Sequence, residues 1–389
     1  SSPAGDDETS GLAVVENARR CILDNIMDFD PDIALKKESF LARFYHAVQE
    51  RCDNIAKKAK RGEMRIFAKL NLMQFSLEMN SEGLHDIDEI IKLIFMTSTA
   101  NPLTWGHILT PLVALDVLNA DIIVMQAVGK IIQKKLYPSE RVPVAHRHHM
   151  VRESIKGLFP LVRYTDLGSE ENDELESAAQ AHRFLRLNPG RKLHLFYIIG
   201  AENEARMQKY IRQHYQMFQE YNFGCNPNHK ITFTVTQRGE YGRVVTLDEL
   251  LAISRQAQKE FGSEQFLDIA LIQHPHMDLG VSSSYYRTTQ DGAFVPKVVH
   301  EFSQRYGYYG HPPIDPKTGR PFYAQEEHFR KQVEPVAAEI AAQINAKAKE
   351  GVIGGTPFIS IDGGSGSGKT TVSNEIARYL SEKHGFKCE

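Results

Sequence analysis

The feature that most constrains the fold is an alternation of apolar runs and amphipathic segments between residues 88 and 273. Short, nearly continuous apolar runs are typical of strands buried on both faces; examples are IIKLIFMTS (90–98), ADIIVMQAV (120–128), KLHLFYIIG (192–200), KITFTVTQ (230–237) and FLDIALIQ (266–273). Segments with helical periodicity, such as GHILTPLVALDVL and LDELLAISRQAQKE, separate them. Because a helix between successive strands makes those strands parallel, the pattern predicts a doubly wound α/β domain with a parallel sheet.

The regions on either side of this domain have different patterns. Residues 1–87 contain amphipathic helices, for which a helical cap or an interaction surface is the simplest interpretation. The α/β domain is expected to span 88–312, and a helical linker, 313–354, leads into the next segment through the Gly-rich sequence GVIGGTP (351–357). Such a hinge is typical of a domain boundary, so residues 355–389 are expected to begin another domain.

Composition excludes several classes of partner. With 46 basic and 49 acidic residues, the chain has no global attraction to nucleic acid or to an anionic membrane. The four cysteines form no CxxC pair, which argues against a zinc ribbon or a disulfide framework and favours a reducing cytoplasm. No apolar stretch reaches the roughly 18 residues of a membrane span, and the first residues do not resemble a signal peptide. A cytoplasmic protein, with self-association left open, is expected.

Polar clusters follow the predicted strands, where doubly wound sheets bind their ligands. They are STANPLTWGH (98–107), GAENE (200–204), TQRGEYG (236–242) and HPHMDLGVSSSYYR (274–287). His107 and Arg287 can donate to phosphate oxygens, and Arg238 adds positive charge. The serines at 282–284 can open a helix whose amides bind anions, although a Ser before a helix is more often only a cap. Together the clusters favour a phosphate-binding crevice.

In this order, the segments resemble motifs of the nicotinamide or nicotinate mononucleotide adenylyltransferase family, within the HxGH-type nucleotidyltransferases. NPLTWGH is similar to the strand-end turn of that family, with Thr104 at the position of the first His, as in its eukaryotic-like branch, and His107 at the second. The stretch KKLYPSERVPVAHRHHM is similar to that branch's KKxLxPxxHRxxM, matched by Lys135 and Arg147. IIGAE, VTQRG, VSSSYYR and the tail GAFVPKVVHEFSQRYGYY resemble segments that follow in the family.

The resemblance implies a doubly wound nucleotidyltransferase that joins the AMP part of ATP to a pyridine mononucleotide, with release of pyrophosphate, in NAD biosynthesis. ATP, with Mg²⁺, and a phosphorylated small molecule are the expected partners. Positioning and charge neutralisation supply most of the catalysis in such a reaction. The resemblance implies that His107, Thr104 and Arg287 act on the phosphates. The other expected nucleotide-binding residues are Ser98, Asn101, Gly106, Lys135, Arg147, Gly200, Glu202, Arg238, Ser282, Ser283 and Ser284.

Departures from the family pattern leave the acceptor open. The sequence Ser-Thr-Ala at 98–100 stands where the family has Gly-Ser-Phe, and Glu202 stands in place of Asp. The single Trp, Trp105, lies inside the turn, so the Trp that commonly stacks on the pyridine ring in this family has no evident counterpart. One alternative is an enzyme of the same fold that acts on another phosphorylated acceptor, such as a pantetheine phosphate or a sugar phosphate. The other is a regulatory module that binds nucleotide without chemistry.

A second candidate site is the sequence FISIDGGSGSGKTTVSNEIARYL. An expected strand at 358–361, a Gly-rich loop and an amphipathic helix give the context of a Walker A motif, whose backbone amides wrap phosphates. The P-loop residues are Gly363, Gly368, Lys369, Thr370 and Thr371. The loop is similar to that of uridine kinase-like nucleoside kinases. Since the stretch after it is too short for a Walker B acid and further strands, we expect the front part of a bifunctional protein with a truncated kinase domain.

Histidine-rich stretches at 145–150 and 273–277 could suggest transition-metal sites. They lack nearby carboxylates or thiolates with a definite spacing, which such sites require. No metal-ligating residues are therefore assigned.

Overall fold

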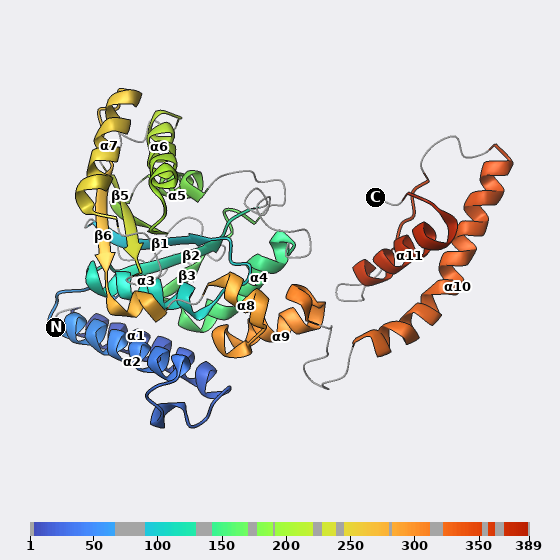
Figure 1. Cartoon of the computed structure of the whole chain (residues 1–389), viewed down its shortest axis with the longest axis horizontal. Coiled ribbons are helices and arrows are strands. Elements are labelled where there is room, and N and C mark those ends of the chain that lie inside the picture. Colours follow the sequence, from blue (N-terminus) through green and yellow to red (C-terminus); the bar gives the residue numbers. More distant parts are fainter. Residues whose placement is uncertain are drawn as a thin grey trace. The chain divides into compact units, whose positions relative to one another are not determined.

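The computed structural model describes residues 4–66, 90–129, 142–169, 177–189, 191–220, 228–238, 245–279, 282–311, 322–351, 357–361 and 369–387. They form two compact units, one of residues 1–303 with 308–310 and one of residues 304–307 with 311–389. The larger unit contains a sheet covered by helices, and the described part of the smaller unit is mainly helical (Figure 1). No helix among the described residues is long and apolar enough to cross a membrane.

The sheet has six strands, and every neighbouring pair is parallel. The strands are β1 (Ile91–Ser98), β2 (Ile122–Ala127), β3 (Val162–Tyr164), β4 (Leu193–Gly200), β5 (His229–Gln237) and β6 (Asp268–Gln273). Their order is β3-β2-β1-β4-β5-β6, so the chain runs outward from β1 to β3, returns beside β1 as β4, and runs outward to β6. The switch point lies between β1 and β4. This order confirms the predicted doubly wound α/β fold.

Helices cover both faces of the sheet (Figure 1). On one face lie α3 (Trp105–Val117) and α4 (Val144–Ile155), and on the other α5 (Ser177–Arg186), α6 (Glu204–Glu220) and α7 (Leu247–Phe261). Successive side chains of β1 alternate between two cores: Ile94 joins the first, while Leu93 and Phe95 join the second. Burial on both faces explains why the strands are almost continuously apolar.

After β6 the chain continues through short helical elements, which belong to the larger unit except for residues 304–306 at the end of α9. They are η6 (Pro275–Leu279), α8 (Ser283–Thr289), η7 (Gly292–Phe294), α9 (Lys297–Tyr306) and η8 (Tyr308–Gly310). Earlier in the chain there are two further short turns, η1 (Ile33–Leu35) and η4 (Lys156–Leu158). The apolar residues Met277, Tyr286, Val299 and Tyr309 belong to the same core as the face of the sheet that α3 covers.

The two N-terminal helices, α1 (Ala4–Met27) and α2 (Phe40–Lys60), lie outside α3 and belong to the larger unit (Figure 1). Ser39 caps α2, since its side chain accepts a hydrogen bond of 3.1 Å from the amide of Ala42. Phe44 of α2 is fully buried and joins the core that contains Trp105 of α3. The helical cap expected from the sequence therefore shares the hydrophobic core of the sheet.

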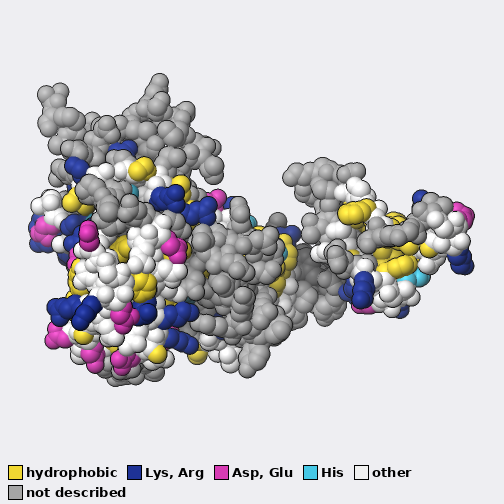
Figure 2. Space-filling model, turned by 90° about the horizontal axis from the view of Figure 1, so that it is seen from above, with side chains coloured by type: hydrophobic (Ala, Val, Ile, Leu, Met, Phe, Trp, Pro, Cys, Tyr) yellow, Lys and Arg dark blue, Asp and Glu magenta, His cyan; other side chains and the backbone are white. Residues whose placement is uncertain are grey.

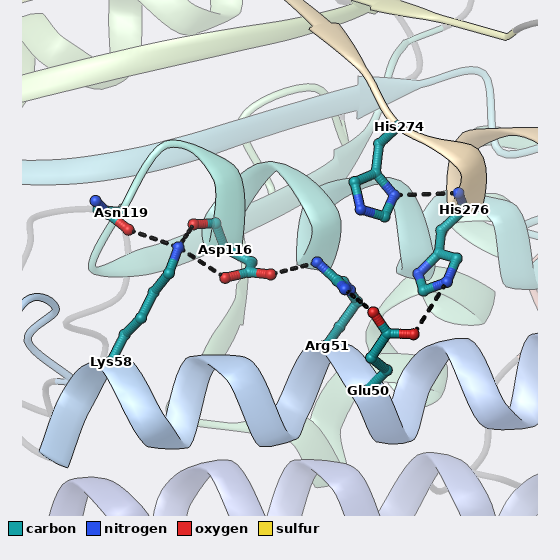
Figure 3. Close-up of polar contacts among 7 residues, drawn as sticks. All are labelled: Glu50, Arg51, Lys58, Asp116, Asn119, His274 and His276. Atoms are coloured by element: carbon teal, nitrogen blue, oxygen red, sulfur yellow. Dashed lines mark hydrogen bonds and ion pairs between the residues drawn. The ribbon is translucent and has the colours of Figure 1, made fainter.

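A buried charge network adds to this packing (Figure 3). Asp116, near the end of α3, is 3% exposed, and its carboxylate accepts from Arg51 at 2.5 Å and from Lys58 at 2.9 Å, both on α2. Glu50 is paired with Arg51, and its other oxygen lies 3.6 Å from Nε2 of His276 in η6. Helix α2 thus links the helix after β1 to the connection after β6.

The smaller unit contains α10 (Phe322–Lys349) and α11 (Lys369–His384). Their small core consists of Val333, Ala337, Ala341, Ile376 and Leu380. The strand expected at 358–361 is wrong: these residues form no strand, and Phe358 is 99% exposed. An isolated extended segment has no partner for its backbone groups, and the described residues of this unit contain no other strand. Figure 2 shows hydrophobic side chains gathered on this unit, whereas both charge signs are interspersed over the larger one.

The helix expected after the Walker A loop is present as α11, which begins at Lys369. Gly363 and Gly368 lie outside the described residues, and for Lys369, Thr370 and Thr371 only the backbone is described. Their role as a nucleotide site stays a prediction.

A buried histidine pair lies on the sheet face covered by α5 and α6. Nε2 of His182 is 3.0 Å from Nδ1 of His214, whose ring packs edge-on against Phe233 of β5. Burial lowers the pKa of His214 to about 3 and, with the neighbouring His214, lowers that of His182 well below its ordinary value. Both rings are therefore neutral in the folded protein near pH 7.

We expect the free energy of unfolding to fall as the pH drops below about 6.5, because the unfolded chain then binds protons that the folded chain does not. Each such histidine contributes up to about 1.4 kcal/mol per pH unit between its unfolded and folded pKa values. Thermal unfolding between pH 7.5 and pH 5 measures the effect. His214→Gln, which cannot titrate but can still hydrogen-bond to His182, should show a shallower pH dependence than the wild type; equal slopes would count against this explanation.

Candidate functional site

The carboxyl ends of four strands lie at one edge of the sheet. β1 runs beside β4 as far as the pair Met96–Ile198, two residues before each strand ends. Gly200, the last residue of β4, pairs with Thr236 of β5, which pairs in turn with Ile272 of β6. The polar clusters after β1, β4, β5 and β6 therefore begin at the same edge, with the switch point between the first two.

The turn after β1 ends in a capping arrangement that fixes His107. Thr104 is the N-cap of α3 and has extended backbone angles. Its amide donates to Nδ1 of His107 at 3.0 Å, and its hydroxyl oxygen lies 2.9 Å from the same nitrogen. Because Nδ1 accepts the amide hydrogen, the neutral imidazole carries its own proton on Nε2. His107 is therefore held as a hydrogen-bond donor through Nε2.

Electrostatics keep this imidazole neutral. Burial, with a further contribution from the Arg238 charge, lowers the pKa of His107 to about 4. Arg238 directly follows β5, so a charge at the end of β5 acts on the imidazole in the first turn of α3. Near pH 7, His107 can donate a hydrogen bond to an anion without carrying a charge itself.

The segment after β6 is bonded directly to the turn after β1. The Ser283 hydroxyl donates to the carbonyl of Pro102 at 2.7 Å, and Nη1 of Arg287 donates to the carbonyl of Asn101 at 2.7 Å. Nη2 of Arg287 also donates to the Ser284 hydroxyl at 3.0 Å. The structure thus brings Arg287 to the turn that carries Thr104 and His107.

Ser282 has a local role in the structure. It is the N-cap of α8, and its side chain accepts a hydrogen bond of 3.2 Å from the amide of Tyr285. The Ser284 hydroxyl likewise accepts within α8, from Arg287, whereas Ser283 bonds α8 to the turn through the carbonyl of Pro102. Their contact with phosphate stays a prediction.

Arg147 of α4 lies in the interior. Its guanidinium is 0% exposed and donates to the carbonyls of Thr99 and Val128 at 2.7 Å each and to that of Gly129 at 3.1 Å. In the structure it therefore braces the chain after β1 and β2, whereas the sequence suggested a phosphate contact. Lys135, the other residue from this stretch, lies outside the described residues.

The cluster after β4 lies next to the switch point. Gly200 is exposed, and the partly exposed Glu202 carboxylate is paired with Arg206 at 2.9 Å. Asn203 caps α6 by accepting a 3.0 Å hydrogen bond from the Arg206 amide. Glu202 thus lies in the short connection between β4 and α6, at the same edge of the sheet as the turn after β1.

At the start of the turn, the Ser98 hydroxyl accepts a 3.1 Å hydrogen bond from the amide of Ala100. Gly106, the second residue of α3, is buried within the same stretch. Both residues belong to the backbone of the turn, and their contact with a nucleotide stays a prediction.

Ala100 adopts a conformation that favours glycine, with φ of 45°. We expect Ala100→Gly to change the free energy of unfolding by less than about 1 kcal/mol. Relief of roughly 1–2 kcal/mol of left-handed strain is offset by the loss of a buried methyl, about 0.8 kcal/mol, and by the entropy of glycine. Ala100→Val, with a branched side chain at the same φ, should cost about 2 kcal/mol or more. Urea unfolding of both variants tests this, and equal losses would contradict it.

Trp105 belongs to the core. It is 2% exposed, and its ring centroid lies 5.7 Å from that of Phe44 on α2. The indole is therefore not available to stack on a ligand.

The histidine-rich stretches make hydrogen bonds and ion-pair contacts within the chain. Nδ1 of His146 lies 2.5 Å from the Tyr308 hydroxyl, and Nδ1 of His148 lies 2.7 Å from that of Tyr164. Among the described residues, no group of three or more His, Cys, Asp or Glu side chains could hold a metal ion.

Tyr309 and Gln290 also hold the site, and sequence reasoning missed both. The Tyr309 hydroxyl donates to Oδ1 of Asn101 at 2.9 Å, and the Tyr309 carbonyl accepts from Nε2 of Gln290 at 2.7 Å. Tyr309 and Asn101 are 208 residues apart, so no local sequence pattern predicts their contact.

Comparison with known proteins gives distant likenesses. No family model matches the chain, and a search of curated proteins gives no match. Two solved structures of Plasmodium falciparum nicotinic acid mononucleotide adenylyltransferase, complexed with NaAD and with APC, are similar at TM-scores of 0.40 and 0.38. Each is 13% identical, and each alignment covers 57% of this chain and 98% of that chain. Likenesses this distant do not establish a function, which has to come from the residues of the chain itself.

Proposed function

We propose that the larger unit is a nucleotidyltransferase that joins the AMP part of ATP to nicotinamide or nicotinate mononucleotide and releases pyrophosphate. The observation that carries the proposal is the position of His107 in the first turn of α3, where Nδ1 accepts the Thr104 amide hydrogen and leaves Nε2 as the donor. His107 lies beside the switch point, on a turn bonded directly to Arg287. The ordered motifs that resemble the adenylyltransferase family support the same reaction.

The proposed chemistry is a single displacement at phosphorus. A phosphate oxygen of the mononucleotide attacks the α-phosphorus of ATP, the bond from that phosphorus to the bridging α–β oxygen breaks, and pyrophosphate leaves. Negative charge grows on the phosphate oxygens, so preorganised donors stabilise the transition state. His107 would donate to an α-phosphate oxygen through Nε2, while Arg287 and Arg238 would neutralise the polyphosphate.

Magnesium enters this proposal as the counter-ion of ATP. The described edge of the sheet offers cations and N–H donors, and two of its acidic residues are already matched with cations: Glu202 is paired with Arg206, and Asp278 interacts with the charge of Arg238. These residues fit a metal that arrives with the substrate, bridging its phosphate oxygens.

The Walker A sequence at 363–370 adds a second proposed nucleotide site, in the smaller unit. Lys369 opens α11 there, as the lysine of a P-loop opens its helix. We propose that this second nucleotide site serves a nucleoside-type kinase activity in a bifunctional protein.

The packing of Trp105 favours a second class of acceptor. The buried Trp105 packs against Phe44, so no described Trp is available to stack on a pyridine ring. An enzyme of the same fold that adenylylates a pantetheine phosphate or a sugar phosphate would need no such stack.

The test is product analysis after incubation of the purified chain with Mg-ATP and each candidate acceptor in turn. Formation of NAD or its acidic analogue, with equimolar pyrophosphate, supports the pyridine nucleotide. Adenylylation of only another acceptor supports the second class. Binding of ATP by calorimetry without any product identifies a nucleotide-binding module and overturns the proposed reaction.

A further inference from the structure

Three segments that are distant in sequence form a closed ring of hydrogen bonds around the turn after β1. Asn101 accepts from Tyr309 at its side-chain oxygen and from Arg287 at its carbonyl. Gln290, which ends the helix that carries Arg287, donates to the carbonyl of Tyr309 at 2.7 Å. The ring therefore runs from the turn to α8, from α8 to Tyr309, and from Tyr309 back to the turn.

The Asn101–Tyr309 contact of the ring is buried, whereas Arg287 and Gln290 are partly exposed. Asn101 is 1% exposed and Tyr309 is 5% exposed, so their hydrogen bond is shielded from water. Gln290 and Tyr309 both have positive φ angles, 57° and 58°, which non-glycine residues adopt only where the surroundings require it. Gly310 has φ of 80°, and a Cβ there would lie 2.8 Å from Nε2 of Gln290. Because Gly310 has no side chain, the Gln290 amide can approach this closely.

The hydroxyl of Tyr309 is fixed as a donor. Burial raises its pKa well above the ordinary value, so the phenol stays protonated at any working pH. A carboxamide that accepts at Oδ1 has a defined orientation. The orientation of Asn101 matters because the same turn continues directly into Thr104 and His107.

We infer that Tyr309 is a positioning residue of the nucleotidyl transfer. Through Asn101 it sets the turn after β1 against α8, and with it the direction in which Nε2 of His107 points relative to Arg287. This inference rests on the proposed function. Since a displacement of about 1 Å at a reacting group can cost as much as 10²-fold in rate, one hydroxyl far from the phosphates can control catalysis.

Tyr309→Phe removes only that hydroxyl. We expect kcat to fall about tenfold, because the His107 donor acts mainly in the transition state, while KM for Mg-ATP changes less than threefold. Tyr308→Phe is the matched control: it removes a neighbouring hydroxyl that bonds to His146 at 2.5 Å instead of to the turn. Its kcat should stay within twofold of the wild type. Equal kcat losses in the two variants, or a wild-type kcat in Tyr309→Phe, overturn the inference.

A double-mutant cycle with Asn101→Ala separates positioning from general stability. If Tyr309 acts through Asn101, adding Tyr309→Phe to Asn101→Ala lowers kcat by less than twofold. Multiplied effects overturn the inference, because they mean that the two residues act independently.

Hydrogen–deuterium exchange keeps this inference distinct from the proposed function. If the wild-type chain makes no adenylylated product, the proposed function fails. Hydrogen–deuterium exchange then still tests whether the Tyr309 hydroxyl holds the turn through Asn101. We expect faster exchange over residues 101–109 and 284–290 in Tyr309→Phe and unchanged exchange there in Tyr308→Phe. Unchanged exchange in Tyr309→Phe would show that the ring does not depend on this hydroxyl.

Discussion

The variant His107→Asn should lose nearly all nucleotidyl transfer, with a fall in kcat of about 10²- to 10³-fold, and keep its fold. The asparagine oxygen can replace Nδ1 and accept the Thr104 amide hydrogen, which preserves the cap of α3. It offers no donor at the position of Nε2. His107→Gln is the complementary variant, since its amide nitrogen reaches the Nε2 position but leaves the cap unmade. It should retain more activity and lose about 1 kcal/mol of stability.

Steady-state kinetics and thermal unfolding of the two variants, measured side by side, check this separation. An active His107→Asn would mean that the Nε2 donor is not needed, and the proposed role of His107 would be wrong. The pH dependence gives an independent check, because a pKa of about 4 means that His107 is already neutral at pH 6. The ratio of wild-type kcat to that of His107→Gln should therefore be constant from pH 6 to pH 8. A ratio that falls as the pH rises through this range would indicate a charged imidazole.

Most of the sheet could be predicted because burial on both faces leaves a strong apolar signal in the sequence. The exceptions were β3 and α5, which the sequence pattern did not reveal. β3 has only three residues, and one of them is the buried Arg163. α5 turns Gln180 and His182 toward the interior, where both are 0% exposed. α5 also has only ten residues, fewer than the roughly 11 to 18 over which helical periodicity is recognised in a sequence.

Charged helical faces are usually solvated, and the sequence predicts that residues 1–87 form a helical cap or an interaction surface. Arg51 of α2 is instead 5% exposed and paired with the buried Asp116 of α3. Arg51 and Asp116 are 65 residues apart in the sequence. Their pairing depends on how the two helices pack, and neither segment alone shows that packing.

The turn after β1 could be located because strand ends in doubly wound sheets bind ligands, whatever the details of the sequence. The residues that hold the turn could not be found in this way. Tyr309 contacts a side chain far along the sequence, and Arg147 contacts main-chain carbonyls, which every residue possesses. The resemblance of its stretch to the family motif predicts a nucleotide contact for Arg147, and that contact stays a prediction beside the three carbonyls.

Arg147→Lys should destabilise the larger unit by about 3 kcal/mol and weaken catalysis as well. The guanidinium makes three hydrogen bonds to carbonyls in the interior, and hydrogen bonds to charged groups contribute about 1.5–3 kcal/mol each. A lysine ammonium keeps the charge but lacks the planar fork that reaches both chain segments. We expect a fall in melting temperature of roughly 6–12 °C and, because Thr99 begins the turn, a fall in kcat beyond the loss of folded protein.

Arg163→Lys on β3 is the matched control for that prediction. Its guanidinium is 3% exposed and donates from Nε to the carbonyl of Pro160 at 3.1 Å, and burial lowers the pKa of both arginines to about 10. β3 is the edge strand two positions from β1, so Arg163→Lys should destabilise the fold without changing kcat per folded molecule.

Calorimetry gives the stability of each variant, and kinetics at a temperature where both are folded give kcat. If the two variants lost the same fraction of kcat, the contact of Arg147 with the turn would have no specific part in catalysis. If Arg147→Lys kept full ATP affinity and full stability, the direct phosphate contact suggested by the sequence would explain the residue better than the three carbonyls do.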